Sequence, residues 1–257
     1  MNQLNKKNCK IDLSIVVPIH NEENNIAKLF EEIVTAIKTD YSFEVLFVDD
    51  GSNDSSLKIL KDLNSQYNNL RIVRHKIKSG QSAALLSGVK FSYGEWIVTL
   101  DGDGQNDPKD IITLLTERNK LNFNEGLFMF VGQRKKRIDS NYKKIQSKIA
   151  NIIRKSLLND RTPDTGCGLK LFQRSLFLSL PHFDHMHRFL PALAIIKGAS
   201  IISIKVNHRK RYSGTSHYGM IDRLFAGIFD LFGVLWLKKR LILVEPVEVN
   251  NNLNSKE

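Results

Sequence analysis

The chain has 257 residues, with 38 basic and 27 acidic side chains and a formal net charge of +11. Apolar residues make up 42% and charged residues 25%, which is typical of a globular protein with a sizeable core and argues against wholesale disorder and a polytopic membrane protein. Two cysteines are too few for a disulfide framework, and the apolar run near the N-terminus is too short for a signal-peptide core, so a reducing compartment is expected.

The charge is unevenly distributed along the chain. Residues 1–105 carry 12 basic and 14 acidic side chains, whereas residues 132–240 carry 22 basic and 6 acidic ones. A strongly basic surface suits nucleic acid, an anionic membrane or a phosphorylated ligand. The two halves of the chain are therefore expected to have different functions.

Short apolar runs at 13–17, 43–48, 70–73 and 95–100 predict buried strands in the first half. Residues 26–37 place their apolar side chains on one helical face, and similar spacing recurs near 57–63 and 84–89. Strand and helix alternate, which predicts right-handed βαβ units and a mostly parallel, Rossmann-like central sheet flanked by helices. The predicted fold class is α/β.

The second half is less regular. We predict strands at 127–131 and 201–206, a basic amphipathic helix at 141–158, a helix at 185–197 and an apolar helix at 220–237. Residues 159–170 and 207–219 are expected to be loops. Residues 1–240 then form one domain, followed by a disordered tail (241–257).

Acidic side chains follow three of the predicted strands, where the ligand of an open parallel sheet binds. Asp101 and Asp103 can turn both carboxylates toward one point, as a hard cation such as Mg²⁺ or Mn²⁺ requires. The alternative for this pair is a solvated Asp-Gly turn. Asp49 and Asp50 could accept a hydrogen bond from a nucleotide base, or simply belong to a strand–turn–helix whose helix is capped by Ser52.

Residues 224–237 are apolar except for Asp230, with cations on both sides. A 14-residue helix spans about 21 Å, less than the ~30 Å hydrocarbon core of a bilayer. The segment therefore predicts an amphipathic helix at the membrane interface, with Trp236 and the flanking cations as anchors. A core helix or a dimer contact is the alternative.

Six strings, in this order, resemble family 2 of the inverting nucleotide-sugar glycosyltransferases with a GT-A fold. The resemblance is to the dolichol-phosphate mannosyltransferase-like branch, the polyprenyl-phosphate sugar synthases, and covers about residues 13–240. The strings are VVPIHNEENNI (16–26), FVDDGSNDSS (47–56), GQSAALLSGVKFSYGEWIVTLDGDGQNDP (80–108), VGQRKKR (131–137), DTGCGLKLF (164–172) and RYSGTSHYG (211–219).

The resemblance implies a nucleotide-binding half (1–131) and an acceptor- and membrane-facing half (132–240) within the domain, and it implies roles for the acidic strand ends. The positions that hold the nucleotide are matched by Pro18, Glu22, Asp49, Asp50 and Asp101. The family's D-x-D-x-Q motif, which holds a Mg²⁺ or Mn²⁺ ion and the sugar diphosphate, is matched by Asp101, Asp103 and Gln105.

The basic half is implied to hold phosphates, and Asp101, Asp103, Arg134 and Arg211 are the implied catalytic set. Positions that face the acceptor phosphate or diphosphate are matched by Arg134, Lys143, Ser147, Arg211 and Ser216. Lys143 replaces an Arg of the family, and His217 stands where a Lys is frequent. Asp164 matches the Asp before the family's S-G-F-R string, which reads Thr165-Gly166-Cys167-Gly168 here and lacks the Arg.

The implied reaction transfers a glycosyl group from a UDP- or GDP-sugar to a polyprenyl phosphate for a cell-envelope glycan or lipid. A lipid phosphate is already anionic, so positioning and charge neutralisation suffice without a dedicated base. The expected location is peripheral, on the cytoplasmic face of the membrane, with a membrane-anchoring subunit or a second copy as possible partner. The alternatives are a sugar or glycolipid acceptor, a nucleic-acid-binding protein, which the absence of a recognisable binding motif disfavours, and an inactive scaffold, which the intact D-x-D disfavours.

Overall fold

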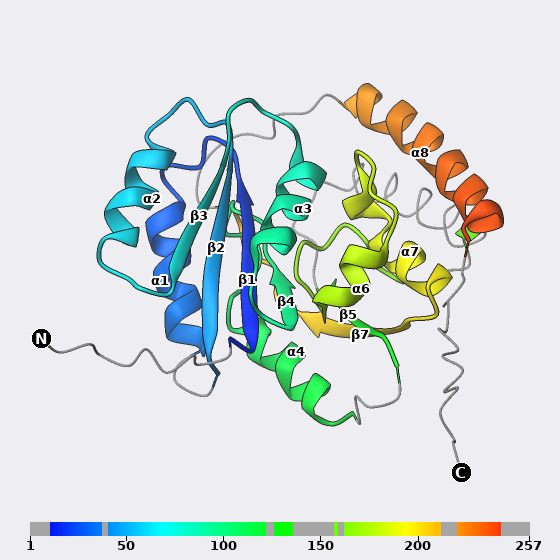
Figure 1. Cartoon of the computed structure of the whole chain (residues 1–257), viewed down its shortest axis with the longest axis horizontal. Helices are drawn as coiled ribbons and strands as arrows, with labels where there is room; N and C mark the ends of the chain where they lie inside the picture. Colours follow the sequence, from blue (N-terminus) through cyan, green and yellow to red (C-terminus); the bar gives the residue numbers. More distant parts are fainter. Residues whose placement is uncertain are drawn as a thin grey trace, which may run out of the picture.

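The computed structural model describes residues 11–37, 41–121, 126–135, 157–158, 162–211 and 220–242. Seven strands form one sheet in the order β3-β2-β1-β4-β6-β5-β7 (Figure 1). The strands are β1 (Leu13–Ile19), β2 (Phe43–Asp50), β3 (Leu70–His75), β4 (Trp96–Thr99), β5 (Phe128–Arg134), β6 (Lys170–Gln173) and β7 (Ser200–Val206). The predicted α/β class with a mostly parallel sheet is confirmed.

One strand, β6, runs against its neighbours. It pairs antiparallel with β4 and with β5, whereas the other described pairs, β1–β2, β1–β4, β2–β3 and β5–β7, are all parallel. The carboxyl ends of the six parallel strands therefore share one edge of the sheet, and β6 begins at that same edge. The side chains at the start of β6 join those that follow the other strands.

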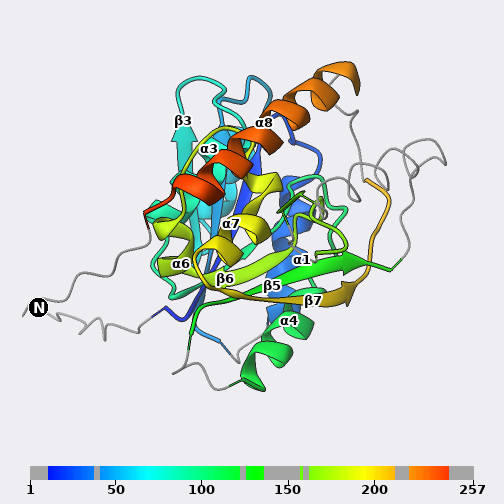
Figure 2. The ribbon, with the colours of Figure 1, turned by 90° about the vertical axis from the view of Figure 1, so that its right-hand side faces the viewer.

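Helices cover both faces of the sheet. One apolar core lies between the sheet and α1 (Ile26–Ile37), α2 (Ser56–Asn64) and α4 (Asp110–Asn119). The other lies under α3 (Gln81–Phe91), α6 (Arg174–Ser179) and α7 (Leu190–Ile196), and α8 (Met220–Arg240) packs on it from outside (Figures 1 and 2). Because both faces are covered, β1, β2 and β4 are buried along almost their whole length and are mostly apolar, as their sequences predicted.

Several predicted elements of the second half need correction. Residues 159–170 were predicted as a loop, but Lys170 begins the strand β6, which was not predicted. Helix α6, and helix α4 in the first half, were not predicted either. The single helix predicted at 185–197 is a 3-10 turn, Met186–Arg188, followed by α7. The predicted basic helix 141–158 lies outside the described residues except for 157 and 158, and the predicted tail 241–257 except for 241 and 242.

Helix α8 lies on the outside of the molecule, beside α7 (Figures 1 and 2). Leu231 and Val234 face the protein and join the second core, whereas Phe229, Phe232 and Trp236 are 75%, 64% and 63% exposed. The helix is thus amphipathic. The described residues contain no helix with the length and hydropathy needed to span a membrane.

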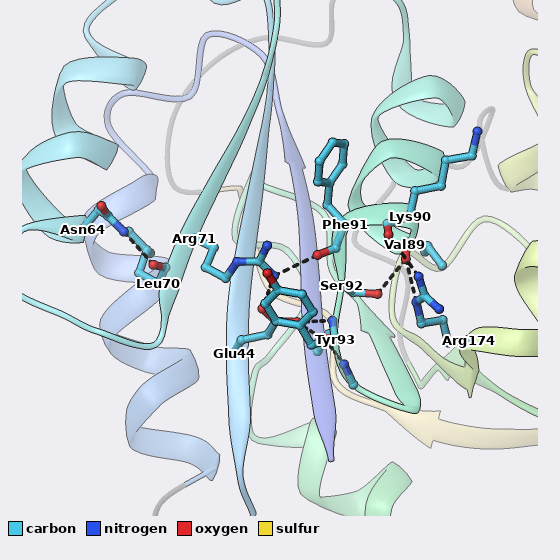
Figure 3. Close-up of polar contacts among 12 residues, drawn as sticks. Glu44, Asn64, Leu70, Arg71, Val89, Lys90, Phe91, Ser92, Tyr93 and Arg174 are labelled. Carbon is cyan, nitrogen blue, oxygen red and sulfur yellow. Dashed lines mark hydrogen bonds and ion pairs between the residues drawn. The ribbon is translucent and has the colours of Figure 1, made fainter. Parts of the chain in front are cut away.

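A buried carboxylate links several segments at the edge of the sheet where the parallel strands begin (Figure 3). Glu44, 1% exposed, accepts hydrogen bonds from Ser14 Oγ at 2.6 Å, from the Tyr93 backbone N–H at 2.6 Å and from Arg71 Nη1 at 2.5 Å. Arg71 also donates to the Phe91 carbonyl at 2.8 Å and lies over the Tyr93 ring. These contacts join β1, β2 and β3 to the turn that leads from α3 into β4.

We predict that Glu44→Ala lowers the free energy of unfolding by about 3 kcal/mol, because it leaves a partly buried guanidinium and two further donors without their acceptor. Denaturant unfolding measures the change. Glu117→Ala, which removes an exposed carboxylate paired with Lys120, is the control and should change the free energy by less than about 1 kcal/mol. Equal shifts for the two variants would contradict the assigned role of Glu44.

Candidate active site

The strand ends at one edge of the sheet gather most of the predicted site residues. The chain runs from β1 to β2 and β3 on one side and then returns from β3 to β4 on the other side of β1. The strand order therefore reverses at β1, which opens a crevice beyond its carboxyl end. Asp101 and Asp103 follow β4, Asp49 and Asp50 end β2, and Pro18 lies in β1. The predicted nucleotide and metal positions therefore converge on this crevice.

The loops after β1 and β2 are tied together by hydrogen bonds. Ser52 Oγ accepts from the Asn21 N–H at 2.9 Å, Ser56 Oγ accepts from the Glu22 N–H at 3.0 Å, and Asn21 Oδ1 accepts from the Asn53 N–H at 2.9 Å. Ser52 was predicted as a possible helix cap, but its hydroxyl binds the neighbouring loop instead. This bracing fixes the wall of the crevice next to β1 and β2.

The two adjacent aspartates of β2 have different surroundings. Both carboxylate oxygens of Asp50 are hydrogen-bonded within the protein. They accept from the Ser79 and Gly80 N–H groups, both at 2.8 Å, and Oδ1 also contacts His75 Nδ1 at 2.7 Å. Asp49 Oδ1 accepts from the Ser52 N–H at 3.0 Å, whereas its buried Oδ2 has no hydrogen bond among the described residues and lies 3.6 Å from Arg74 Nε. Asp49 is therefore better suited to accept a bond from a ligand, and Asp50 to hold the start of α3.

Asp101 lies directly after β4 and is only partly exposed. Gln81 Nε2 donates to its Oδ1 at 3.0 Å, and its backbone N–H donates to Asn106 Oδ1 at 3.1 Å. Burial, reinforced by the nearby charge of Asp103, raises the pKa of Asp101 to about 6, while Lys170 and Arg134 act in the opposite direction. Two crowded carboxylates of this kind are stabilised by any cation placed between them.

Asp103 is 8% exposed and has a cationic partner. Arg211 Nη2 donates to its Oδ2 at 2.8 Å, and the Gln105 N–H donates to its Oδ1 at 3.0 Å. The structure thus brings Asp101, Asp103, Gln105 and Arg211 into one site, although Arg211 lies more than a hundred residues further along the chain.

Arg134, at the end of β5, forms a bidentate ion pair with Asp164. Its Nε and Nη2 donate to the two carboxylate oxygens at 2.7 and 2.8 Å, and the backbone N–H of Arg134 reaches Oδ2 at 3.3 Å. The planar, bidentate pair fixes the orientation of the guanidinium. Asp164 is thereby placed as a positioning residue for Arg134.

A buried lysine, Lys170, was missed by sequence reasoning. It is 4% exposed at the start of β6, its Nζ donates to the Cys167 carbonyl, and burial lowers its pKa while Cys167, Asp101 and Asp164 oppose that shift. The S-G-F-R string was matched to residues 165–168, where no cation occurs. Cys167-Gly168-Leu169-Lys170 keeps the glycine and a cation at the second and fourth positions, and that spacing was the available signal.

Gly168 allows the loop before β6 to lie directly against the Asp101 carboxylate. A Cβ at residue 168 would lie 2.2 Å from Asp101 Oδ2 and 2.3 Å from its Cγ, so no larger residue fits without displacing that carboxylate. Thr99 Oγ1 donates to the Gly168 carbonyl at 2.6 Å and holds the loop in place.

The N-terminal turn of α3, which carries Gln81, is supported by a histidine. Ser82 Oγ and His187 Nδ1 are hydrogen-bonded at 2.8 Å. Burial, with the cations Arg188 and Lys170 adding to it, lowers the pKa of His187 to about 3. His187 is therefore a neutral hydrogen-bonding partner near neutral pH.

The donor atoms suit a divalent metal that shares its shell with phosphate. Asp101, Asp103 and Gln105 offer hard oxygen ligands on one short loop, as Mg²⁺ and Mn²⁺ prefer. No group of three or more His, Cys, Asp or Glu side chains with metal-binding geometry occurs in the described part of the chain. The remaining ligands would have to come from elsewhere, as a diphosphate could provide. Lys143, Ser147, Ser216 and His217 lie outside the described residues.

Residues 14–180 match the sequence profile described as glycosyl transferase family 2, and the chain belongs to this family. It is therefore a glycosyltransferase. It is 36% identical over 234 residues to a dodecaprenyl-phosphate galacturonate synthase of Rhizobium johnstonii, and that match covers 89% of this chain and 68% of the relative.

Solved structures show the same GT-A fold. Glucosyl-3-phosphoglycerate synthase of Mycobacterium tuberculosis, in complex with Mn²⁺, UDP-glucose and phosphoglyceric acid, superposes with a TM-score of 0.62 at 18% identity. A complex of that enzyme with Mg²⁺ and UDP also gives 0.62, at 17% identity. Each match covers 89% of this chain and 79% of the solved one.

We predict that His187→Asn flattens the pH dependence of stability between pH 6.5 and 3. The unfolded histidine takes up a proton near pH 6.5 but the folded one only near pH 3, so this group's contribution is present above 6.5 and is lost as the pH falls. Removing it lowers the slope of unfolding free energy against pH by up to about one proton, or 1.4 kcal/mol per pH unit.

Denaturant unfolding at several pH values measures this slope. His182→Asn, which removes a histidine bonded to the Phe177 carbonyl, is the control for loss of an imidazole. Parallel pH profiles for the wild-type protein and His187→Asn would contradict the assignment.

Proposed function

We propose that this glycosyltransferase moves a glycosyl group from a nucleotide sugar to a polyprenyl phosphate. The observation that carries the proposal is the pairing of the two acids Asp101 and Asp103 with cations from the basic half. Asp103 contacts Arg211 directly, and Lys170 and Arg134 act on Asp101 electrostatically. A site built this way suits a diphosphate leaving group and a phosphate acceptor together. The likeness to a dodecaprenyl-phosphate galacturonate synthase supports the lipid acceptor.

The nucleotide would lie against the ends of β1 and β2. Asp49 would accept a hydrogen bond from the base through its buried Oδ2, while Pro18 and Glu22 line the adjoining loop. Asp50 would contribute by holding the turn at Gly80. Both UDP and GDP remain as donors to test, and the named relative makes a galacturonate donor the first sugar to try.

Asp101, Asp103 and Gln105 would hold a Mg²⁺ or Mn²⁺ ion. Such an ion neutralises negative charge on a departing nucleoside diphosphate. The neighbouring Lys170 and Arg134 lower the cost of collecting several carboxylates here, and Asp164 keeps the Arg134 fork oriented. Glycosyltransferases of this fold have been solved with Mn²⁺ and with Mg²⁺.

The acceptor phosphate would be bound by the basic half. Arg134 and Arg211 lie at the site edge, and Lys143, Ser147 and Ser216 are the further positions proposed from the sequence. A phosphate oxygen is nucleophilic at neutral pH, so these side chains need only hold it in line with the anomeric carbon.

Helix α8 would hold the enzyme on the cytoplasmic face of the membrane. Its exposed Phe229, Phe232 and Trp236 recur at helical spacing, and its last turn carries Lys238, Lys239 and Arg240. Aromatic side chains beside cations suit the interface of an anionic bilayer. A membrane-anchoring subunit or a second copy of the chain could strengthen this binding.

The first test is transfer from UDP- and GDP-sugars to a C55 lipid phosphate, detected by mass spectrometry with Mg²⁺ or Mn²⁺ present. We expect Asp103→Asn to lower kcat/KM by at least about 100-fold, because it weakens the charge balance on the leaving group. Asp107→Asn, on the same loop, is the control, since its side chain only accepts from the Lys109 N–H at 3.1 Å and pairs weakly with Arg209.

Product formed only on a free sugar or a glycolipid, and never on the lipid phosphate, would overturn the proposed acceptor. Undiminished transfer by Asp103→Asn would overturn the metal role of that residue.

The membrane role predicts that the double variant Phe232→Ser and Trp236→Ser binds anionic vesicles at least about 10-fold more weakly, because two exposed aromatic side chains are removed from the apolar face. Co-sedimentation with phosphatidylglycerol vesicles measures this. Phe91→Ser, which removes an exposed aromatic from α3, should leave binding unchanged. Equal retention of the double variant and the wild-type protein would refute the role of α8.

A further inference from the structure

The Arg211–Asp103 ion pair concerns a carboxylate that the proposed function assigns to the metal. Arg211 Nη2 lies 2.8 Å from Asp103 Oδ2, with side-chain exposures of 29% and 11%. The other oxygen, Oδ1, accepts from the Gln105 N–H at 3.0 Å. Both oxygens of Asp103 are therefore engaged within the protein, one of them by a full positive charge.

The segment that carries Arg211 is fastened in place by several contacts. Asp110 accepts from the Asn207 backbone N–H at 2.7 Å and from its side chain at 3.2 Å. The Arg209 N–H donates to the Gln105 carbonyl at 2.9 Å, and its guanidinium binds Glu32 at 2.8 Å and the Asn106 carbonyl at 3.0 Å.

This fastening ties the chain after β7 to α1, to α4 and to the loop of the acidic pair. The contacts of residues 207–209 thus place Arg211 next to Asp103. The ion pair therefore depends on the fold of this segment as well as on the Arg211 side chain.

A cation that coordinates Asp103 must compete with Arg211. A guanidinium–carboxylate bond of this length is charge-assisted and strong, and it is only partly screened at these exposures. A metal ion arriving alone would have to displace Arg211 and leave its charge uncompensated. A metal arriving with a diphosphate brings a new anionic partner for that charge.

We propose that Arg211 is a built-in counter-ion, which competes with the divalent metal for Asp103 and transfers to the diphosphate when the nucleotide binds. This inference rests on the proposed function. It makes metal and nucleotide bind cooperatively, because each removes the obstacle to the other, and the coupling must be equal in both directions. The metal site is thereby weak in the absence of the donor substrate.

The test is Mn²⁺ binding by the full chain, followed by electron paramagnetic resonance with and without UDP or GDP. We expect Arg211→Gln to bind Mn²⁺ alone about 5- to 10-fold more tightly than the wild-type protein and to lose a similar factor of the enhancement caused by the nucleotide. Lys210→Gln removes one exposed charge from the same segment and should behave as the wild-type protein does. Thermal unfolding confirms that each variant is folded.

Equal or weaker Mn²⁺ binding by Arg211→Gln in the absence of nucleotide would overturn the inference. So would an identical effect of Lys210→Gln, which would assign the change to bulk charge, or an absence of Mn²⁺ binding by every protein. The proposed function is judged separately, by sugar transfer to the lipid phosphate in the wild-type protein.

Discussion

The antiparallel pairing of β4 with β6 is the constraint on which the site depends. It sets Thr99 opposite Lys170 and brings Gly168 so close to Asp101 that a Cβ would collide with the carboxylate. The acidic strand ends of the near-neutral first half and the cations of the basic second half thereby meet at one edge of the sheet. Without this pairing, Asp101 would be a partly buried acid with few cations near it, a costly arrangement.

Charge balance explains why the site is assembled from distant segments. Asp103 and Asp164 are buried and Asp101 is partly exposed, and cations from β5, β6 and the segment after β7 lie beside them. Three of the cations, Arg134, Lys170 and Arg211, come from the half whose excess of positive charge is evident in the sequence. Part of the positive charge of residues 132–240 thus neutralises carboxylates of the first half, and the net charge of +11 remains for anionic ligands.

The sequence predicted the strands of the first half well, because each is a short apolar run buried on both faces. It missed β6, since four residues that follow a Pro- and Gly-rich loop carry too little periodicity to predict a strand. It recognised Asp101, Asp103 and Arg211 through motifs, yet the Arg211–Asp103 contact depends on how β7 ends. The different surroundings of Asp49 and Asp50 likewise arise from the turn at Gly80, which is a tertiary contact.

The direction of β6 has a consequence for how such an enzyme can diversify. The chain leaves the sheet at Arg134 and returns at Lys170 on the same edge. The two ends of the segment between these residues are therefore neighbours whatever its length. Segments of different size and chemistry can be exchanged between these two points without changing the order or register of the strands. In the proposed function the acceptor positions Lys143 and Ser147 lie in this segment, so exchanging it would change the acceptor while the residues proposed to hold the nucleotide are kept.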